Sequence, residues 1–104
     1  MAITLSVIYP NRWGSRFDMA YYLGPHLDLV GKLWGDKLIS ARAMKGLQTP
    51  DPNTLPPYQV IALFEVESID VLHKLMDQHG AVIMGDVVKF TDVKPIVQVS
   101  ENLG

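Results

Sequence analysis

The chain of 104 residues contains no cysteine, which excludes disulfide bonds, thiolate nucleophiles and cysteine-based metal sites. Its 9 basic and 11 acidic residues are mixed along the chain without a basic cluster. This distribution argues against a dedicated nucleic-acid-binding surface and against a polybasic membrane anchor. No apolar run approaches the ~20 residues that a membrane-spanning helix needs.

Several motifs of cofactor-dependent or nucleophilic enzymes are missing as well. The sequence has no G-x-x-x-x-G-K-[ST] or G-x-G-x-x-G phosphate loop and no serine nucleophile elbow. His73 and His79 have poor spacing for one helical face, and no carboxylate completes a metal-ligand set with them. The start of the chain lacks the features of a signal peptide. We therefore expect a cytoplasmic protein that binds no metal, nucleotide or other cofactor.

The length and the hydrophobic fraction of 48% predict one globular domain over residues 1–104. Residues 37–45 fit a strand or a helix by pattern alone, and we favour a strand because Gly35 and Gly46 bound the segment closely. The segment 58–66 is apolar on both faces through its middle, as expected of a central strand. In all, four segments predict strands: residues 3–9, 37–45, 58–66 and 95–101.

A first helix is predicted to begin near Ser15, because Ser15 and Asp18 have the spacing of a capping box. Gly24 and Pro25 interrupt this helix. Proline lacks an N–H and clashes with the carbonyl four residues earlier, so we expect a kink or a fresh start at Pro25. The apolar residues recur at helical spacing and form one stripe: Met19, Tyr22, Leu23, His26, Leu27, Val30, Leu33 and Trp34.

A second helix is predicted to begin after Ser68, whose hydroxyl can cap the first turn, and to end at Gly80. Residues 81–94 suggest a short helical turn followed by a loop around residues 90–92. The inner side of the helix is expected to carry Ile69, Leu72, Leu75, Met76 and His79.

The resulting order is β-α-β-β-α-β, which predicts an α+β, ferredoxin-like fold with two helices on one face of a four-stranded antiparallel sheet. The other face needs a cover, because Ile61 and Leu63 on the central strand would otherwise face water. A second copy of the chain, packed sheet to sheet about a two-fold axis, would provide it and form a dimeric α+β barrel. The proline-rich loop of residues 46–57 either closes over a pocket or reaches the partner subunit.

The sequence resembles the EthD family, named after a protein of ethyl tert-butyl ether degradation, within the dimeric α+β barrel superfamily. The resemblance runs from Ile3 to Glu101 and rests on an ordered set of short pieces. These pieces are Val7-Ile8-Tyr9-Pro10, Arg16-Phe17-Asp18, Tyr21-Tyr22, His26, Leu29-Val30, Phe90-Thr91-Asp92-Val93 and Pro95-Ile96-Val97-Gln98-Val99-Ser100.

Similar barrels include small cofactor-free enzymes that cyclise, dehydrate or oxygenate aromatic and polyketide-like substrates, and isomerases and decarboxylases of aromatic degradation. The resemblance therefore implies a cofactor-independent oxidoreductase, lyase or isomerase acting on a small apolar aromatic or carbonyl compound in catabolic or secondary metabolism. The alternative is a non-catalytic homodimer that binds a small hydrophobic ligand or a partner protein. Fold analogy alone does not choose between them.

His26 is the strongest catalytic candidate, because it lies in the middle of an apolar stripe that faces the sheet. A buried imidazole needs a hydrogen-bond partner or a cavity, and an unperturbed histidine titrates near neutral pH, which suits proton transfer. The alternative is a structural histidine bonded to a backbone carbonyl. Tyr22 lies one turn earlier on the same face and could orient a substrate oxygen, or it could be a core aromatic residue.

Four further residues are weighed for the same site. Asp92 could hold His26 in one tautomer or act as a base, and it could equally be a turn residue that bonds its own backbone. Tyr9 could reach the mouth of the pocket, and Phe90 could form its wall, although both also fit a hydrophobic core. His79 is a weaker candidate for substrate binding, because a cation at the end of the second helix also suits the helix dipole.

Overall fold

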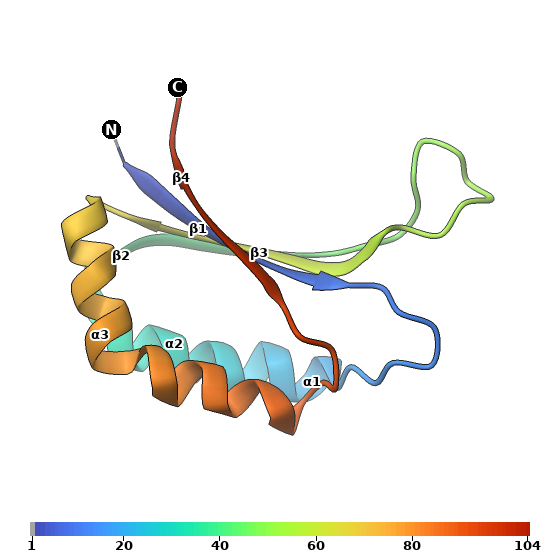
Figure 1. Ribbon diagram of the computed structural model, residues 1–104, viewed down its shortest axis with the longest axis horizontal. Coiled ribbons are helices and arrows are strands. Elements are labelled where there is room, and N and C mark those ends of the chain that lie inside the picture. Colours follow the sequence, from blue (N-terminus) through green and yellow to red (C-terminus); the bar gives the residue numbers. More distant parts are fainter. Residues whose placement is uncertain (1) are drawn as a thin grey trace.

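Four antiparallel strands form a single sheet in the computed structural model, which describes residues 2–104 (Figure 1). The strand order across the sheet is β2-β3-β1-β4, with β1 and β3 in the centre. All four predicted strands are confirmed within one residue at either end. They are β1 (Ile3–Pro10), β2 (Leu38–Lys45), β3 (Tyr58–Val66) and β4 (Ile96–Glu101).

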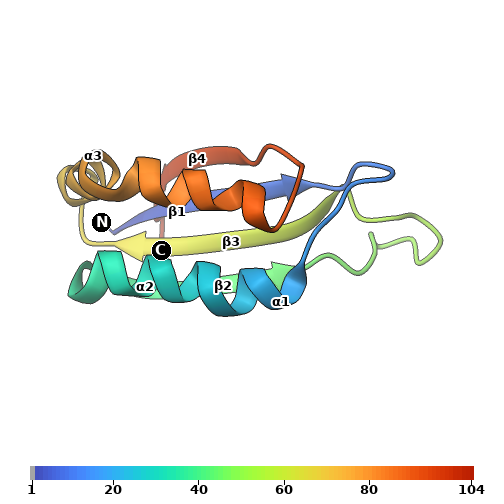
Figure 2. The same ribbon diagram turned by 90° about the horizontal axis from the view of Figure 1, so that it is seen from below.

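Two helical segments cover one face of this sheet, one toward the β2 edge and the other toward the β4 edge (Figure 2). The element order confirms the ferredoxin-like arrangement. Within residues 2–104, no helix is both long and apolar enough to cross a bilayer. The first segment comprises α1 (Met19–Tyr21), a π-helical turn (Tyr22–His26), α2 (Leu27–Trp34) and a 3₁₀ turn (Gly35–Lys37), and the second comprises α3 (Ile69–Asp86) and a 3₁₀ turn (Val87–Lys89).

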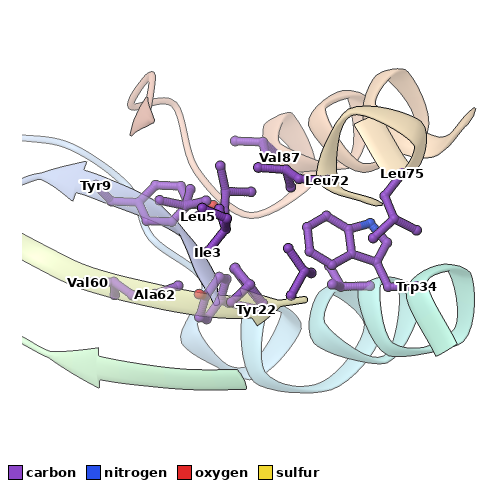
Figure 3. Close-up of a cluster of buried hydrophobic side chains, with 14 of the residues drawn as sticks. Ile3, Leu5, Tyr9, Tyr22, Trp34, Val60, Ala62, Leu72, Leu75 and Val87 are labelled. Atoms are coloured by element: carbon purple, nitrogen blue, oxygen red, sulfur yellow. The ribbon is translucent and has the colours of Figure 1, made fainter. Parts of the chain in front are cut away.

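The core lies between the helices and the inner face of the sheet (Figure 3). Because side chains alternate along a strand, every second residue of β1 and β3 points into this core. The antiparallel register places the two sets directly opposite one another, as in the pair of Leu5 and Phe64. The buried residues of the two central strands are Ile3, Leu5, Val7, Tyr9, Val60, Ala62, Phe64 and Val66.

The expected helix start at Ser15 is wrong. Asp18 is the N-cap, and its carboxylate accepts a hydrogen bond of 3.0 Å from the backbone N–H of Tyr21. The chain before it stays extended because it pairs with the segment that follows α3. Phe17 forms a bridge with Thr91, and the Asp18 N–H donates to the carbonyl of Phe90 at 2.7 Å. These contacts satisfy backbone groups that a longer helix would otherwise have used.

The interruption at Pro25 is a π-helical turn rather than a sharp kink or a fresh start. The N–H of Leu27 donates a bifurcated hydrogen bond to two backbone carbonyls, that of Tyr22, five residues earlier, and that of Gly24. A wider turn accommodates the proline ring without the clash that a regular α-helix would impose. The same widening changes which side chains face inward, and Leu23, expected on the apolar stripe, is largely exposed.

The expected end of the second helix at Gly80 is also wrong, since α3 continues to Asp86. Gly80 is buried in the middle of the helix, and a β-carbon there would lie 3.3 Å from the terminal methyl of Met76. The glycine therefore serves close packing and does not cap the helix. Ser68 is confirmed as the N-cap, whereas Ile69, expected inside, is 46% exposed.

Candidate functional site

A cavity of about 50 Å³ lies between the two helical segments and the inner face of the sheet. Val97 on β4 and Met84 on α3 line it and are also 43% and 39% exposed, so the cavity reaches the surface between these two elements. Its walls are almost entirely apolar. The lining residues are Leu5, Val7, Tyr9, Tyr22, His26, Val30, Trp34, Phe64, Met76, Gly80, Ile83, Met84, Val87 and Val97.

One stripe of the first helical segment supplies most of the polar atoms of the cavity. Tyr22, His26, Val30 and Trp34 are spaced four residues apart, and all are buried. In the π turn a spacing of four residues still keeps two side chains together, and the rings of Tyr22 and His26 stack with 5.6 Å between their centroids. A phenol, an imidazole and an indole therefore face the same apolar space.

His26 is paired with Asp86, the last residue of α3. The imidazole Nδ1 lies 2.9 Å from Asp86 Oδ2, and both side chains are buried. Asp86 Oδ1 accepts a second hydrogen bond of 2.8 Å from the hydroxyl of Tyr21, and the Lys89 ammonium lies 3.5 Å from the same oxygen. Two residues 60 positions apart in the sequence are thus joined across the helix pair.

Burial would by itself raise the pKa of Asp86, but its surroundings reverse this effect. Hydrogen bonds from His26 and Tyr21, together with the electrostatic attraction of His26 and Lys89, hold the pKa of this carboxyl below its ordinary value. The same hydrogen bond to Asp86 raises the pKa of the Tyr21 hydroxyl. Asp86 is therefore a carboxylate at neutral pH.

An ionised carboxylate can only accept hydrogen bonds, so Nδ1 of His26 must carry the proton of the shared bond. The other ring nitrogen, Nε2, forms no hydrogen bond within residues 2–104, and His26 lines the cavity. In the neutral ring, Nε2 is then a free acceptor on a residue that lines an apolar cavity. A carboxylate that fixes the tautomer of a histidine in this way is the arrangement that makes the ring an effective proton acceptor and donor.

The two tyrosines of the cavity remain protonated at neutral pH. Burial raises the pKa of Tyr22 to about 12, and burial together with the nearby Tyr22 also raises the pKa of Tyr9. Among the described residues, the Tyr22 hydroxyl has no hydrogen-bond partner although it is buried. Tyr22 can therefore donate a hydrogen bond to a bound oxygen but cannot act as a base near pH 7.

Phe90 packs against His26 with 4.6 Å between the ring centroids, yet it is not a lining residue of the cavity. It is completely buried and also contacts the rings of Tyr9 and Tyr22. This placement fits a residue that fixes the positions of the other rings. The structure thus brings four of the predicted site residues together: Tyr9, Tyr22, His26 and Phe90.

Two predicted site residues lie elsewhere. Asp92 does not contact His26; it accepts a 3.0 Å hydrogen bond from the backbone N–H of Arg16 and lies 3.3 Å from the Arg12 guanidinium. The first of these contacts and the nearby charge of Arg12 lower the pKa of Asp92, which is exposed. His79 is neither at the end of α3, as expected, nor in the lining of the cavity. Within residues 2–104, no group of three or more acidic or histidine side chains could hold a metal ion.

Comparison with solved structures places the chain in a family. An EthD-like protein from Ralstonia eutropha JMP134 shares 33% of its sequence with this chain, and the match covers 96% of this chain and 90% of that one, with a TM-score of 0.90. The chain belongs to the EthD family. No family model and no curated protein matches the sequence.

More distant structures share the fold of this EthD-family chain. An ethyl tert-butyl ether degradation family protein from Bacillus halodurans C-125 has 14% identity and a TM-score of 0.70, with 99% of this chain and 100% of that chain covered. A dimeric ferredoxin-like protein from Thermobifida fusca YX has 10% identity and a TM-score of 0.62, with 98% and 92% covered.

Three residues of the candidate site were missed in the sequence: Asp86, Tyr21 and Trp34. Asp86 stands alone in the apolar run Ala-Val-Ile-Met-Gly-Asp-Val-Val, and an isolated carboxylate in such a run is a signal of a paired, buried charge. Ending the helix at Gly80 hides this signal, because it separates Asp86 from the helix that lies beside the first helical segment. In the sequence, Tyr21 is noted only within the Tyr21-Tyr22 piece of the family resemblance, and Trp34 only as a member of the apolar stripe.

Proposed function

We propose that this EthD-family chain is a cofactor-free enzyme that moves a proton at a carbon atom next to a carbonyl group of a small, largely apolar compound. The observation that carries the proposal is the buried Asp86–His26 pair, in which His26 lines an apolar cavity and uses only Nδ1 for hydrogen bonding among the described residues. Fully packed structural histidines have both ring nitrogens bonded. A histidine with one nitrogen held by a carboxylate and the other free is suited to acid–base catalysis.

In this mechanism the carbonyl oxygen of the substrate accepts a hydrogen bond from the Tyr22 hydroxyl. Nε2 of His26 removes a proton from the adjacent carbon, and negative charge develops on the oxygen that Tyr22 holds. Asp86 stabilises the imidazolium that forms and keeps its orientation. Return of the proton to another carbon atom gives isomerisation, and transfer to a β-hydroxyl that leaves as water gives dehydration. In a cyclisation the enolate carbon forms a bond with a second carbonyl carbon of the same compound, and Nε2 delivers the proton to the oxygen of that carbonyl.

The cavity selects for apolar compounds and must widen to admit them. Its volume of about 50 Å³ is smaller than the ~150 Å³ apolar cavity that holds benzene in an engineered protein. Met76 and Met84 on the α3 wall have unbranched, flexible side chains that can change rotamer at little cost. Substrate entry between α3 and β4 would move these two side chains first.

Proton removal can be tested without knowing the complete reaction. Wild-type protein in D₂O is expected to accelerate the exchange of hydrogen for deuterium next to the carbonyl of aryl-substituted butan-2-ones, followed by proton NMR. Addition of the protein after heat denaturation is the control for catalysis by buffer. If a panel of such ketones binds without any exchange above this control, the chain is a binding protein and the catalytic proposal fails.

We also propose that the outer face of the sheet packs against a second copy of the chain. The strand register places Ile8, Ile61, Met44 and Ile96 side by side on this face, which no helix covers. They form an apolar patch that would be exposed to water in a single chain. The protein from Thermobifida fusca with the same fold is dimeric, which supports the proposal that this chain pairs with a second copy.

Replacing Ile61 with lysine is expected to convert the dimer to a monomer, because two like charges would face each other across the two-fold axis. The side chain points away from the helices, so the fold of the single chain should persist. Light scattering after size-exclusion chromatography measures the mass. The matched control is Ile69→Lys, at an exposed position on α3, which should remain dimeric. A wild-type monomer at all concentrations would contradict the proposal.

A further inference from the structure

Trp34 carries a buried hydrogen-bond donor that the mechanism above does not use. It is the last residue of α2, is 3% exposed and lines the cavity. Its indole Nε1–H has no hydrogen-bond partner among the described residues. An indole nitrogen can only donate, and a buried donor without a partner is unfavourable, so buried tryptophans usually find an acceptor.

The position of this donor defines a second polar end of the cavity. Trp34 follows His26 by two helical turns, which corresponds to roughly 12 Å along the helix axis at 1.5 Å per residue. Val30 lies between them, and the facing residues of the sheet and of α3 are mostly apolar. Tyr9 and Trp34 lie at opposite sides of the core cluster (Figure 3). The cavity is therefore apolar in its middle and lies between two lining residues, Tyr22 and Trp34, that each carry a buried hydrogen-bond donor without a partner among the described residues.

We infer that Trp34 is a specificity-determining residue that binds a second oxygen of the ligand, remote from the oxygen held by Tyr22. The ligand class is then an elongated, largely apolar compound with one hydrogen-bond acceptor at each end, such as an aryl diketone. This inference rests on the proposed function in one respect, since that function places the reacting carbonyl of the ligand beside Tyr22 and His26. An acceptor at the far end fixes the length and direction of the bound compound, which places its reacting carbon at His26.

A matched pair of compounds tests this assignment by calorimetric titration. The probe is 4-(4-acetylphenyl)butan-2-one, and its partner is 4-(4-isopropylphenyl)butan-2-one, which has a methyl group in place of the second oxygen. The variant is Trp34→Phe, which removes the indole N–H but keeps an aromatic ring. The matched control is Trp13→Phe, because Trp13 is 97% exposed and is not among the lining residues.

The measurement that tests the role of Trp34 is the ratio of the dissociation constants of the acetyl and isopropyl compounds. Relative to wild type, Trp34→Phe is expected to shift this ratio about 5-fold toward the isopropyl compound, the size of effect that one neutral hydrogen bond produces, whereas Trp13→Phe leaves it unchanged. An unchanged ratio in Trp34→Phe, or failure of both compounds to bind the wild-type protein, would overturn the inference.

Failure of this inference can be told apart from failure of the proposed function. The affinity ratio reports on Trp34 alone, whereas deuterium exchange reports on His26. A shifted ratio without exchange would retain the ligand class and remove the catalytic role. Exchange with an unshifted ratio would retain the catalysis and remove the role of Trp34.

Discussion

Replacing His26 with glutamine is expected to lower the rate of deuterium exchange by about 100- to 10,000-fold, the usual contribution of a general base. The amide of glutamine can still donate a hydrogen bond to Asp86, so the buried carboxylate keeps a partner and the chain should remain folded. It cannot accept a proton near neutral pH. Exchange is measured by NMR with the same ketones as for wild type, and folding by circular dichroism.

The matched control for this variant is His79→Gln, since His79 lies on α3 outside the cavity lining. Its exchange rate should equal that of wild type. Full activity in His26→Gln, or an equal loss in both variants, would show that proton transfer does not depend on the Asp86–His26 pair.

The Asp86→Asn substitution is expected to lower the free energy of unfolding at pH 7 by on the order of 2 kcal/mol. This is the typical contribution of a hydrogen bond to a charged group. The substituted amide would no longer provide the negative charge that His26 and Lys89 face, and its single oxygen could satisfy only one of the two hydrogen-bond donors well. For a chain of this length the melting temperature should fall by about 4–8 °C for each kcal/mol.

The pH dependence of this loss follows from the lowered pKa of Asp86. A carboxyl whose pKa is lower in the folded than in the unfolded chain stabilises the fold fully above the unfolded value of about 3.9, and this stabilisation is lost as the pH falls through the folded value. The gap in stability between wild type and Asp86→Asn should therefore be full from about pH 5 to pH 7 and should shrink in more acidic solution.

Urea unfolding at pH 7 and at pH 3 measures this gap, with Asp92→Asn as the control at an exposed carboxyl. The control variant should lose much less at pH 7, because the ion pair of Asp92 with Arg12 is solvated. An equal loss at both pH values in Asp86→Asn would show that the charge of Asp86 does not stabilise the fold.

The sequence was sufficient to predict the strands and the alternating core, because period-two patterns in β1 and β3 leave little choice of face. It was also sufficient to select His26 and Tyr22, which share one helical stripe. The partner of His26 was not predictable in the same way. Asp86 is 60 positions away, and its identification depended on α3 continuing through Gly80.

The two errors in the helix boundaries have different causes. Gly80 carries the local signal of a helix end, but a glycine inside a helix costs only about 1 kcal/mol, and α3 continues through it to Asp86. Ser15 carries the signal of a helix start, yet pairing of Phe17 with Thr91 keeps the chain extended up to Asp18. At Ser15, contacts with a distant segment therefore outweighed a genuine local preference.

The π-helical turn at Tyr22–His26 makes the candidate site sensitive to the number of residues and less so to their identity. Deleting one residue between Tyr22 and His26 would restore a regular α-helix and shorten their spacing from four residues to three. The two rings would then be offset along and around the helix and would lose the stacking that they show here. Natural variants of this chain should therefore differ freely in the length of the loop of residues 46–57 but keep the count between Asp18 and His26 constant.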